Sequence, residues 1–444
     1  MNPIVITGAG CRFARTETPE VFWRHTLANE SLLSPCPRAH ELLAKAEAIG
    51  QPWLCPPRRA GLLEGLYSYD PEVFDAPENF MPDALFAAQL AVEALRDAGL
   101  STRSLAPGRT GVYVGYANVC APAAENVLQH LHNVDQTVAL ARSLFPRADE
   151  PQLAALGRHL RAGLPAFTQA AVRNAHPHAL AAGVAGLLGF AGPARVACDG
   201  HAAFFGALRM ALDDLNRERA DAALVGAVNP PFTAASLLAA CAAQETTRHE
   251  IPHALCRSAD GMAPGEGGAF FVLQRAGGSF SYNAAPYAVA RGVATLAGCH
   301  AEVVGRAAEA VLCEAGVELC HVGYVEANGS GVPREDAAEL EAMAAFFTPS
   351  APVAVGTAKP VFGHALAASG AMGFLRAALA LRHKIFPPSL IAGKPHARLA
   401  QSRAVYVPAE PRPWVSGAPQ RFAGVTCMDP AGLCGQAVLQ EFLP

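Results

Sequence analysis

Short apolar runs alternate with amphipathic or alanine-rich stretches along almost the whole chain, and this alternation constrains the fold most strongly. The runs Ile4–Thr7 and Thr110–Gly115 have the length and composition of buried strands. The stretches Ala84–Ala98 and Ala202–Arg219 are long enough for helices, and Gly99 is suited to a left-handed helix terminus. Strands and helices in alternation predict an α/β protein with layered packing.

The same alternation starts again in the second part of the chain. Residues Gly277–Ala285 are rich in Gly, Ser and Asn, which is typical of a linker. After this linker we expect a strand at Val322–Glu326 and a helix at Ala365–Arg382. Because 444 residues are many for one hydrophobic core, we predict two similar halves, residues 1–277 and residues 278–444.

The composition excludes several classes of function. Hydrophobic residues make up 51% of the chain and charged residues 16%, so we expect a large interior and a surface partly buried against another subunit. The formal net charge of −4 offers no basic field to nucleic acid or anionic lipid. We see neither a basic leader nor an apolar run of membrane-spanning length, and we therefore expect a cytoplasmic protein.

Nothing in the sequence predicts a metal or a cofactor. The 12 cysteines are scattered, with no C-x-x-C pair and no histidine cluster at ligand spacing. The loop Ile6–Gly10 looks like the start of a dinucleotide-binding turn, but the third glycine would fall at Phe13, whose side chain would block close packing of helix on strand. A tight turn after the first strand is the better interpretation, and we do not predict a dehydrogenase.

Several short motifs occur in one order along the chain and resemble those of a single family. They are Ile4–Gly8 with Phe22-Trp23, Phe74-Asp75 with Met81-Pro82-Asp83, Arg109–Gly115, Asp260-Gly261 with Gly265-Glu266-Gly267, and Glu410–Trp414. Their order and spacing are similar to those of the β-ketoacyl-[acyl carrier protein] synthases, including the synthase domains of polyketide synthases. The resemblance implies a thiolase-like, five-layered α-β-α-β-α fold made of two similar halves.

The family's nucleophile is a Cys in a D-T-A-C-S-S motif at the start of a buried helix, where the helix dipole favours the thiolate. Alignment without gaps between Gly192-Pro193 and Ala223–Asn229 places His201 at this position. The nearby Cys198 would fit only with compensating gaps, and its thiol would then lie on the strand. We therefore predict that the chain lacks the nucleophilic Cys.

The family also uses two histidines that polarise the malonyl thioester. In its E-A-H-G-T-G-T-P motif the histidine is Asn328 here, whereas the acidic residues that follow, Asp336 and Glu339, are kept. In its K-S-N-I-G-H motif both Lys359 and His364 are kept. Asn328 can donate a hydrogen bond but cannot carry a proton. We interpret Lys359 and Glu339 as a structural salt bridge.

The last loop of the family, S-F-G-F-G-G-T-N, supplies a backbone N–H to the oxyanion hole from its second Phe. The aligned residues here are Cys427–Cys434, in which Asp429 replaces a glycine and Pro430 replaces that Phe. Proline has no N–H, and loss of one such donor typically costs about 3–4 kcal/mol of transition-state stabilisation. The predicted site residues His201, Asn328, His364 and Lys359 therefore correspond to an active site with doubtful activity.

Two interpretations of His201 stay open. In the first, His201 fills the space of a lost nucleophile and is neutral, because the helix dipole opposes its protonation. In the second, His201 and His364 act as an acid/base pair on a carrier-bound acyl chain, for example in decarboxylation. The first interpretation is favoured.

Relatives without the Cys are similar to chain-length factors. We therefore predict a non-condensing subunit of polyketide or fatty-acid biosynthesis, with two partners: a Cys-bearing β-ketoacyl synthase, bound as a heterodimer, and acyl carrier protein. The alternative is an acyl-thioester enzyme, such as a malonyl-carrier decarboxylase, that uses His201 and His364. We expect residues 118–167 to be an insertion or a cap over the mouth of the site.

Overall fold

The computed structural model describes residues 3–37, 39, 41–42, 44, 56–63, 81–117, 122–229, 237, 240–241, 243, 245–277, 285–430 and 432–443. The motif Phe74-Asp75 and most of the predicted linker Gly277–Ala285 lie outside these residues. The boundary proposed after residue 277 adjoins this gap and stays a prediction. Within the described part of the chain, no helix is long and apolar enough to cross a membrane.

The fold is organised around one mixed sheet of 11 strands, in which two sets of strands have the same order. The first set is β5-β4-β6-β7-β1, made of β1 (Ile4–Arg12), β4 (Thr110–Tyr116), β5 (Ala194–Ala197), β6 (Ala222–Asn229) and β7 (Gly267–Arg275). The second set is β10-β9-β14-β15-β8, made of β8 (Ala288–Ala297), β9 (Val322–Glu326), β10 (Val353–Gly356), β14 (Phe422–Asp429) and β15 (Leu433–Gln440). Because the order repeats, the prediction of two similar halves is confirmed.

The two sets meet where β1 pairs antiparallel with β8. The short strand β12 (Val405–Tyr406) extends the second set beyond β10. Two small sheets pair β2 (Ser34–Pro35) with β3 (Arg59–Ala60), and β11 (Ile385–Phe386) with β13 (Arg412–Pro413).

Two helices lie between the two halves of the sheet. Helix α9 (Ala203–Asn216) contacts β4 and β6 of the first half and β8 and β15 of the second, and α14 (Ser369–His383) contacts β9 and β14 as well as β7. Residues Ser369–Leu381 of α14 are all buried. A helix that is hydrophobic all round belongs in a core layer, so α9 and α14 form the central layer of the fold.

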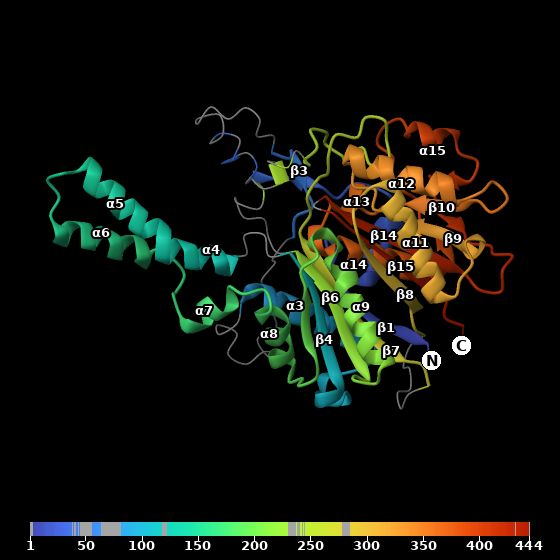
Figure 1. Ribbon diagram of the computed structural model, residues 1–444, viewed down its shortest axis with the longest axis horizontal. Coiled ribbons are helices and arrows are strands. Elements are labelled where there is room, and N and C mark those ends of the chain that lie inside the picture. The colour runs from blue at the N-terminus through green and yellow to red at the C-terminus, as the bar shows by residue number, and fades with distance from the viewer. Residues whose placement is uncertain are drawn as a thin grey trace.

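The outer layers consist of two helix pairs, as Figure 1 shows. Helices α3 (Pro82–Asp97) and α8 (Ala179–Leu188) pack on the first half, whereas α11 (Ala301–Ala315) packs on β8 and β15 with α12 (Pro333–Phe346) beside it. The shorter helices are α1 (Pro19–Ala28), α13 (Lys359–Phe362) and α15 (Ala397–Gln401). The predicted five-layered, thiolase-like architecture is thus confirmed.

Local sequence explains where these helices begin and end. Helix α1 follows Thr18, whose hydroxyl accepts a hydrogen bond from the N–H of Val21, and it begins with Pro19 at its first position. Helix α3 also begins with a proline, Pro82. As predicted, Gly99 follows α3 in a left-handed conformation with φ of +68°.

Residues 122–162, which we call the helical arm, extend away from the body of the molecule (Figure 1). The arm contains α4 (Pro122–Leu128), a π-helical turn (Gln129–Asn133), α5 (Val134–Leu144) and α6 (Glu150–Ala162); α7 (Gln169–Asn174) follows it. The expectation of a cap over the site is therefore wrong within this chain. The physical reason is that α5 and α6 pack mainly against each other, with Val134 and Leu153 buried between them.

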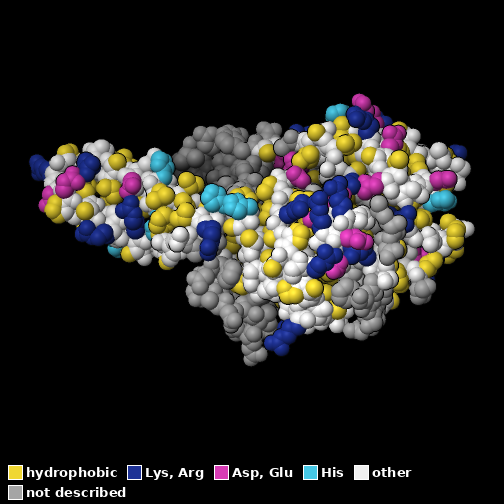
Figure 2. Space-filling model, turned by 60° about the horizontal axis from the view of Figure 1, so that its bottom comes forward, with side chains coloured by type: hydrophobic (Ala, Val, Ile, Leu, Met, Phe, Trp, Pro, Cys, Tyr) yellow, Lys and Arg dark blue, Asp and Glu magenta, His cyan; other side chains and the backbone are white. Residues whose placement is uncertain are grey.

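Most of the large hydrophobic side chains that are exposed in the described residues lie in the helical arm or shortly after it. Seven of the nine large hydrophobic side chains that are exposed in the described residues lie here: Leu128, Leu131, Leu140, Leu144, Phe145, Phe167 and Val172. Figure 2 shows hydrophobic side chains gathered along this projection. Exposed apolar clusters of this kind mark interaction surfaces.

Candidate functional site

The predicted nucleophile position lies where β5 turns into the central helix α9. A short 3-10 turn, Gly200–Ala202, connects them and holds His201. Gly200 has φ of +55°, and a Cβ at this residue would lie only 2.0 Å from Oδ2 of Asp429. Glycine is therefore required here both by the left-handed backbone and by the approach of the Asp429 carboxylate.

The Asp429 carboxylate binds the backbone N–H of the residue at the predicted nucleophile position, His201. The N–H of His201 donates a hydrogen bond to Oδ2 of Asp429 over 2.8 Å. The nearest approach of the His201 ring to this oxygen is 4.0 Å from Nδ1, beyond hydrogen-bond distance. A fixed negative charge thus lies where a thioester oxyanion would need a backbone donor.

The rings of His201 and His364 lie against each other, with centroids 4.8 Å apart and planes at 59°. The pKa of His201 is lowered to about 4, mainly by burial; the charge of Asp429 opposes this shift, and the charge of Lys359 contributes to it. Burial, followed by the charges of Lys359 and His201, holds the pKa of His364 well below its ordinary value. Both rings are therefore neutral at pH 7, as predicted for His201, although burial rather than the helix dipole is the main cause.

Neighbouring groups fix the tautomer of His364. Its Nδ1 accepts a hydrogen bond from the N–H of Leu366 over 3.2 Å, and the hydroxyl of Ser369 lies 3.2 Å from the same nitrogen. An acceptor at Nδ1 places the proton of a neutral ring on Nε2. Neither Nε2 of His364 nor Nδ1 of His201 has a hydrogen-bond partner among the described residues.

Asn328 lies on the other side of the site, at the end of β9, and is completely buried. Its Oδ1 accepts hydrogen bonds from the N–H of Met428 over 3.1 Å and from Nζ of Lys359 over 3.3 Å. Its Nδ2 donates to Oε2 of Glu335 over 2.9 Å. The amide thus links β14 to α12, and both lone pairs of its oxygen and one of its two N–H groups are engaged in this arrangement.

Lys359 and Glu339 do not form the predicted salt bridge. Nζ of Lys359 donates to the backbone oxygen of Asn328, whereas the two carboxylate oxygens of Glu339 accept from the N–H groups of Asn328 and Gly329 over 2.8 and 2.9 Å. The prediction is wrong because each side chain instead binds backbone groups of the loop at Asn328 and Gly329: Lys359 binds a carbonyl oxygen and Glu339 binds N–H groups. Burial raises the pKa of Glu339 to about 7.

A buried ion pair holds the frame around Asn328 and Lys359. The guanidinium of Arg376 on α14 lies 2.5 Å from Oε2 of Glu326, and Oε1 of Glu326 accepts the N–H of Ala358 over 2.9 Å. The side chains of Arg376 and Glu326 are each only 2% exposed. Glu326 therefore ties the two loops that carry Asn328 and Lys359 to the central helix.

The turn between β14 and β15 contains Pro430, at the position where the resemblance places the second oxyanion-hole donor. Pro430 has no N–H to donate, and its carbonyl accepts from Arg334 over 3.5 Å. Arg334 also pairs with Glu245 over 3.2 Å. Burial and the charges of Glu335 and Asp429 raise the pKa of Glu245 to about 7, against the effect of Arg334.

The competing nucleophile Cys198 lies directly after β5 and is exposed. Partial burial and the neighbouring charge of Asp199 raise the pKa of its thiol. A reactive cysteine requires the opposite shift. The alternative alignment with Cys198 therefore has no support from the electrostatics around this thiol.

Two acidic residues of the site could not be assigned from the sequence. Asp429 replaces a glycine of the family motif, and Glu335 lies directly before Asp336, the first acidic residue that the motif keeps. Glu335 is 1% exposed, accepts from Asn328 and from the Ser330 hydroxyl over 2.7 Å, and has one oxygen without a partner among the described residues. The signal was its position four residues before Glu339, which places both carboxylates on one face of α12.

Two stretches of the sequence match models of known protein families. Residues 1–277 match the description "Beta-ketoacyl synthase, N-terminal domain", and residues 287–392 match "Beta-ketoacyl synthase, C-terminal domain".

Curated relatives are much longer than this chain. The chain is 27% identical over 462 residues to 5-methyl-1-naphthoate synthase of Streptomyces sahachiroi, with 100% of this chain and 24% of the relative covered. It is 28% identical over 462 residues to a mycocerosic acid synthase-like polyketide synthase of Mycolicibacterium smegmatis, with 99% and 20% covered. The chain therefore spans about a quarter or less of these proteins.

Solved structures with the same fold include two ketosynthases. The ketosynthase from module 6 of the bacillaene synthase of Bacillus subtilis superposes with a TM-score of 0.80 at 22% identity, covering 100% of this chain and 72% of that one. The oxazolomycin ketosynthase domain of Streptomyces albus superposes with a TM-score of 0.81 at 21% identity, covering 100% and 75%. At this identity the likeness concerns the fold.

Proposed function

The chain belongs to the β-ketoacyl synthase family, and we propose that it is a non-condensing, chain-length-factor-like subunit. In this proposal it pairs with a Cys-bearing β-ketoacyl synthase and takes part in polyketide or fatty-acid biosynthesis on acyl carrier protein. The subunit shapes the site of its partner and does not accept an acyl chain itself.

The hydrogen bond from the His201 N–H to Asp429 carries this proposal. Acyl transfer needs N–H donors directed at the oxygen that becomes negative. In the alignment that we propose, one such donor is the His201 N–H, which is occupied by a carboxylate, and the other falls at Pro430, which cannot supply it. An anion already bound at this point would also repel the developing charge of a thioester oxyanion.

The side chains around this hydrogen bond support the same conclusion. His201 replaces a thiol as the group at the start of the central helix, and Asn328 cannot carry a proton. The oxygen of the Asn328 amide is also occupied by Met428 and Lys359, and one of its N–H groups is held by Glu335. We therefore assign His201, Asn328, His364 and Lys359 to a degenerate active site.

The surface supports the proposed partner. The apolar side chains between Leu128 and Val172 are exposed in the isolated chain, at 39–65% each. A stable subunit would bury such a cluster in an interface. A homologous synthase that keeps the nucleophilic Cys would supply the acyl transfer and condensation that this chain does not perform in our proposal.

Co-expression with a Cys-bearing synthase from the same genome, followed by size-exclusion chromatography with light scattering, tests this proposal. We expect a 1:1 complex that condenses malonyl units, and no condensing activity from this chain alone. Substitution of Leu140 and Leu144 by Asp should weaken the complex, whereas the same substitution at exposed Val415, which lies outside the arm, should not. A lone homodimer that never binds any such synthase would contradict the proposal.

One observation favours a second candidate, a decarboxylase or another acyl-thioester enzyme. Nε2 of His364 carries a proton, is buried, and has no partner among the described residues. Nδ1 of His201, in the adjacent ring, is also buried without a partner among them. A donor of this kind can polarise a thioester carbonyl without any acyl transfer to the protein.

Incubation with malonyl-carrier protein and mass spectrometry of the carrier separates the two candidates. Loss of carbon dioxide that disappears in His364→Ala, but persists in the control His383→Ala at the end of α14, would establish the enzyme. If malonyl-carrier protein loses carbon dioxide no faster with this chain than in buffer alone, the proposal of a non-condensing subunit stands.

A further inference from the structure

Three side chains that can bind a metal ion lie together on the surface, at the turn that leads from α11 into β9. They are Glu318, Cys320 and His321, and all three are exposed. One ligand atom of each, a carboxylate oxygen, the thiol sulfur and a ring nitrogen, lies within 4.8 Å of the other two. Because Asn328 follows the far end of β9, the cluster is separated from the candidate active site by the length of this strand.

The backbone of the turn brings these side chains together. Residues Leu319–His321 form a 3-10 turn, in which the N–H of His321 donates to the carbonyl of Glu318 over 3.0 Å. Side chains at positions i and i+3 are eclipsed in this geometry, so Glu318 and His321 lie on the same side of the turn. One Glu, one Cys and one His within four residues form neither a C-x-x-C pair nor a histidine cluster, and the sequence pattern alone does not reveal the set.

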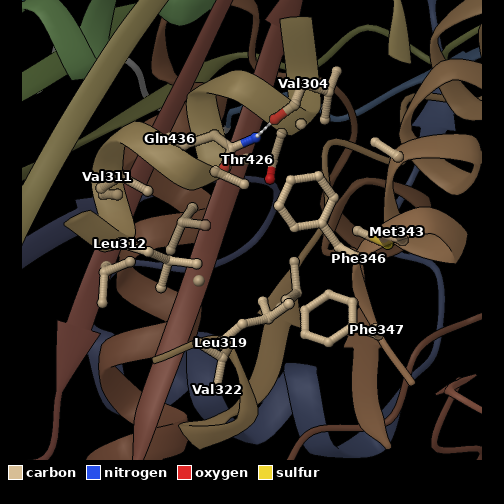
Figure 3. A pocket seen from close by; sticks show the side chains of 18 residues that line it. Val304, Val311, Leu312, Leu319, Val322, Met343, Phe346, Phe347, Thr426 and Gln436 are labelled. Carbon is tan, nitrogen blue, oxygen red and sulfur yellow. Dashed lines mark hydrogen bonds between the residues drawn. The ribbon is translucent and has the colours of Figure 1, made fainter. Parts of the chain in front are cut away.

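The opposite side of the turn is anchored in the apolar interior. Leu319 lies among the apolar side chains between α11, α12 and β14, near Phe347, as Figure 3 shows. Val322, which follows the turn, is 5% exposed. The ring of His321 is stacked on Phe422 at the start of β14, with centroids 6.4 Å apart. Packing therefore holds the backbone that carries the three ligands, and this pre-organisation lowers the conformational cost of binding.

The distances between ligand atoms fit a tetrahedral zinc ion. Sγ of Cys320 lies 3.7 Å from Oε2 of Glu318, with the thiol donating to the carboxylate. Zinc binds thiolate sulfur at about 2.3 Å and carboxylate oxygen at about 2.1 Å, so two such ligands of one tetrahedral ion lie about 3.6 Å apart. A zinc ion in place of the thiol proton therefore needs almost no movement of these two atoms.

The chemistry of the three ligands selects the metal. Magnesium and calcium ions take oxygen ligands, whereas thiolate and imidazole suit zinc. Three protein ligands also leave one position of a tetrahedral ion open to water. A mixed set of sulfur, nitrogen and oxygen thus favours zinc over the hard cations.

We propose that Glu318, Cys320 and His321 bind one Zn²⁺ ion, with water as its fourth ligand. Binding forms a zinc–sulfur bond and releases the thiol proton to solvent, without any change of oxidation state. The ion fastens the connection between α11 and β9. This site is separate from the predicted acyl site and does not depend on whether the chain condenses, decarboxylates or does neither.

Cobalt(II) is the spectroscopic probe for this site. Titration of the full chain with Co²⁺ at pH 7, in the presence of a reductant without thiols, should load a single ion per chain. The spectrum should show the visible bands of a tetrahedral ion together with a thiolate-to-cobalt charge-transfer band. Zn²⁺ should then displace Co²⁺ and abolish both features, because a tetrahedral thiolate site favours zinc.

Matched substitutions separate this site from other exposed thiols and imidazoles. Cys320→Ser should abolish the charge-transfer band, whereas Cys313→Ser, at an exposed cysteine of α11, should leave it unchanged. Loss of an outer-shell partner typically weakens metal binding by about 10–100-fold, and loss of a ligand should cost at least as much. We therefore expect His321→Ala to weaken Co²⁺ binding at least ~tenfold and His159→Ala, on the helical arm, to have no effect.

The four substituted positions are exposed, so these variants should fold like the parent chain, and circular dichroism checks this. A charge-transfer band that requires Cys320 and His321 but neither control residue would support the proposal. Absence of the band in the parent chain, its persistence in Cys320→Ser, or its dependence on Cys313 instead would overturn it.

Discussion

The backbone N–H of His201 and the carboxylate of Asp429 form a 2.8 Å hydrogen bond across the start of the central helix. The two residues are 228 positions apart, and each comes from a different half of the fold. The contact places a negative charge on the donor that would bind a thioester oxyanion in a condensing enzyme of this family. In the proposed alignment of the site, a side chain of the protein itself thus takes the position of the reacting anion.

Removal of this carboxylate should destabilise the chain. Asp429→Ala leaves the partly buried His201 N–H without its acceptor, and hydrogen bonds to charged groups are typically worth about 1.5–3 kcal/mol. We expect the free energy of unfolding in urea to fall by an amount in this range. Glu309→Ala, at an exposed site of α11, should change it by less than about 0.5 kcal/mol. An equally small effect at both sites would contradict the role of Asp429.

The neutral histidine pair should make the chain sensitive to acid. The pKa of His201 is about 4 in the folded chain against an ordinary value of 6.5, so only the unfolded chain takes up a proton between these values. The neutral His201 therefore contributes to the free energy of unfolding above pH 6.5, and this contribution is lost as the pH falls towards 4. A pKa difference of about 2.5 units corresponds to at most ~3 kcal/mol. Urea unfolding at pH 7 and pH 5 should show a smaller pH dependence in His201→Gln than in the parent.

The control for this measurement is His159→Gln, at an exposed position of the helical arm. It should retain the full pH dependence of the parent chain. The buried carboxyls have raised pKa values and act in the opposite direction, but they are common to all three proteins and cancel in the comparison. Identical pH dependence in His201→Gln and the parent would mean that His201 is protonated in the folded chain.

Glu335 should matter for the structure of the Asn328 loop. Glu335→Ala removes the acceptor of both the Asn328 amide and the Ser330 hydroxyl, and each buried donor left unpaired costs about 1–3 kcal/mol. Glu341→Ala on the same helix breaks only an exposed pair with Arg398, worth about 0–1 kcal/mol. Thermal unfolding should therefore separate the two variants clearly; similar melting temperatures would contradict the network.

The buried pair of Arg376 and Glu326 should be the most sensitive ionic contact. Arg376→Met leaves the Glu326 carboxylate buried without its counter-charge, which typically costs about 3–5 kcal/mol. Arg398→Met, in an exposed pair, should cost less than about 1 kcal/mol. Urea unfolding of both variants measures the difference. A loss below 1 kcal/mol for Arg376→Met would show that the pair does not hold the two site loops.

Much of the fold could be predicted because its signals are local. Buried strands such as β4 are continuous apolar runs, and Gly99 ends a helix for reasons that lie within one turn of chain. The five-layered architecture came from the family resemblance, since local patterns do not encode which strands pair. The arm could not be predicted as a projection, because its helices have ordinary amphipathic sequences and only packing decides what they cover.

The site was less accessible from the sequence, because its main contacts join residues far apart in the chain. The positions of His201, Asn328, His364 and Lys359 followed from short motifs. That Asp429 would reach His201 depends on where the turn after β14 lies in space. Lys359 and Glu339 have opposite charges, but each is held by the backbone of the loop that contains Asn328, and no sequence pattern distinguishes this from a salt bridge.

The most direct measurement introduces the missing thiol with and without the carboxylate. The variants His201→Cys, His201→Cys with Asp429→Gly, and Asp429→Gly alone are incubated with the hexanoyl thioester of N-acetylcysteamine. Intact-protein mass spectrometry then follows the acyl adduct. Because one oxyanion donor is worth about 10²–10³ in rate, we expect the double variant to acylate at least tenfold faster than His201→Cys, and Asp429→Gly alone to stay at background. Rapid acylation of His201→Cys, with no gain on removal of Asp429, would contradict a site blocked by its own carboxylate.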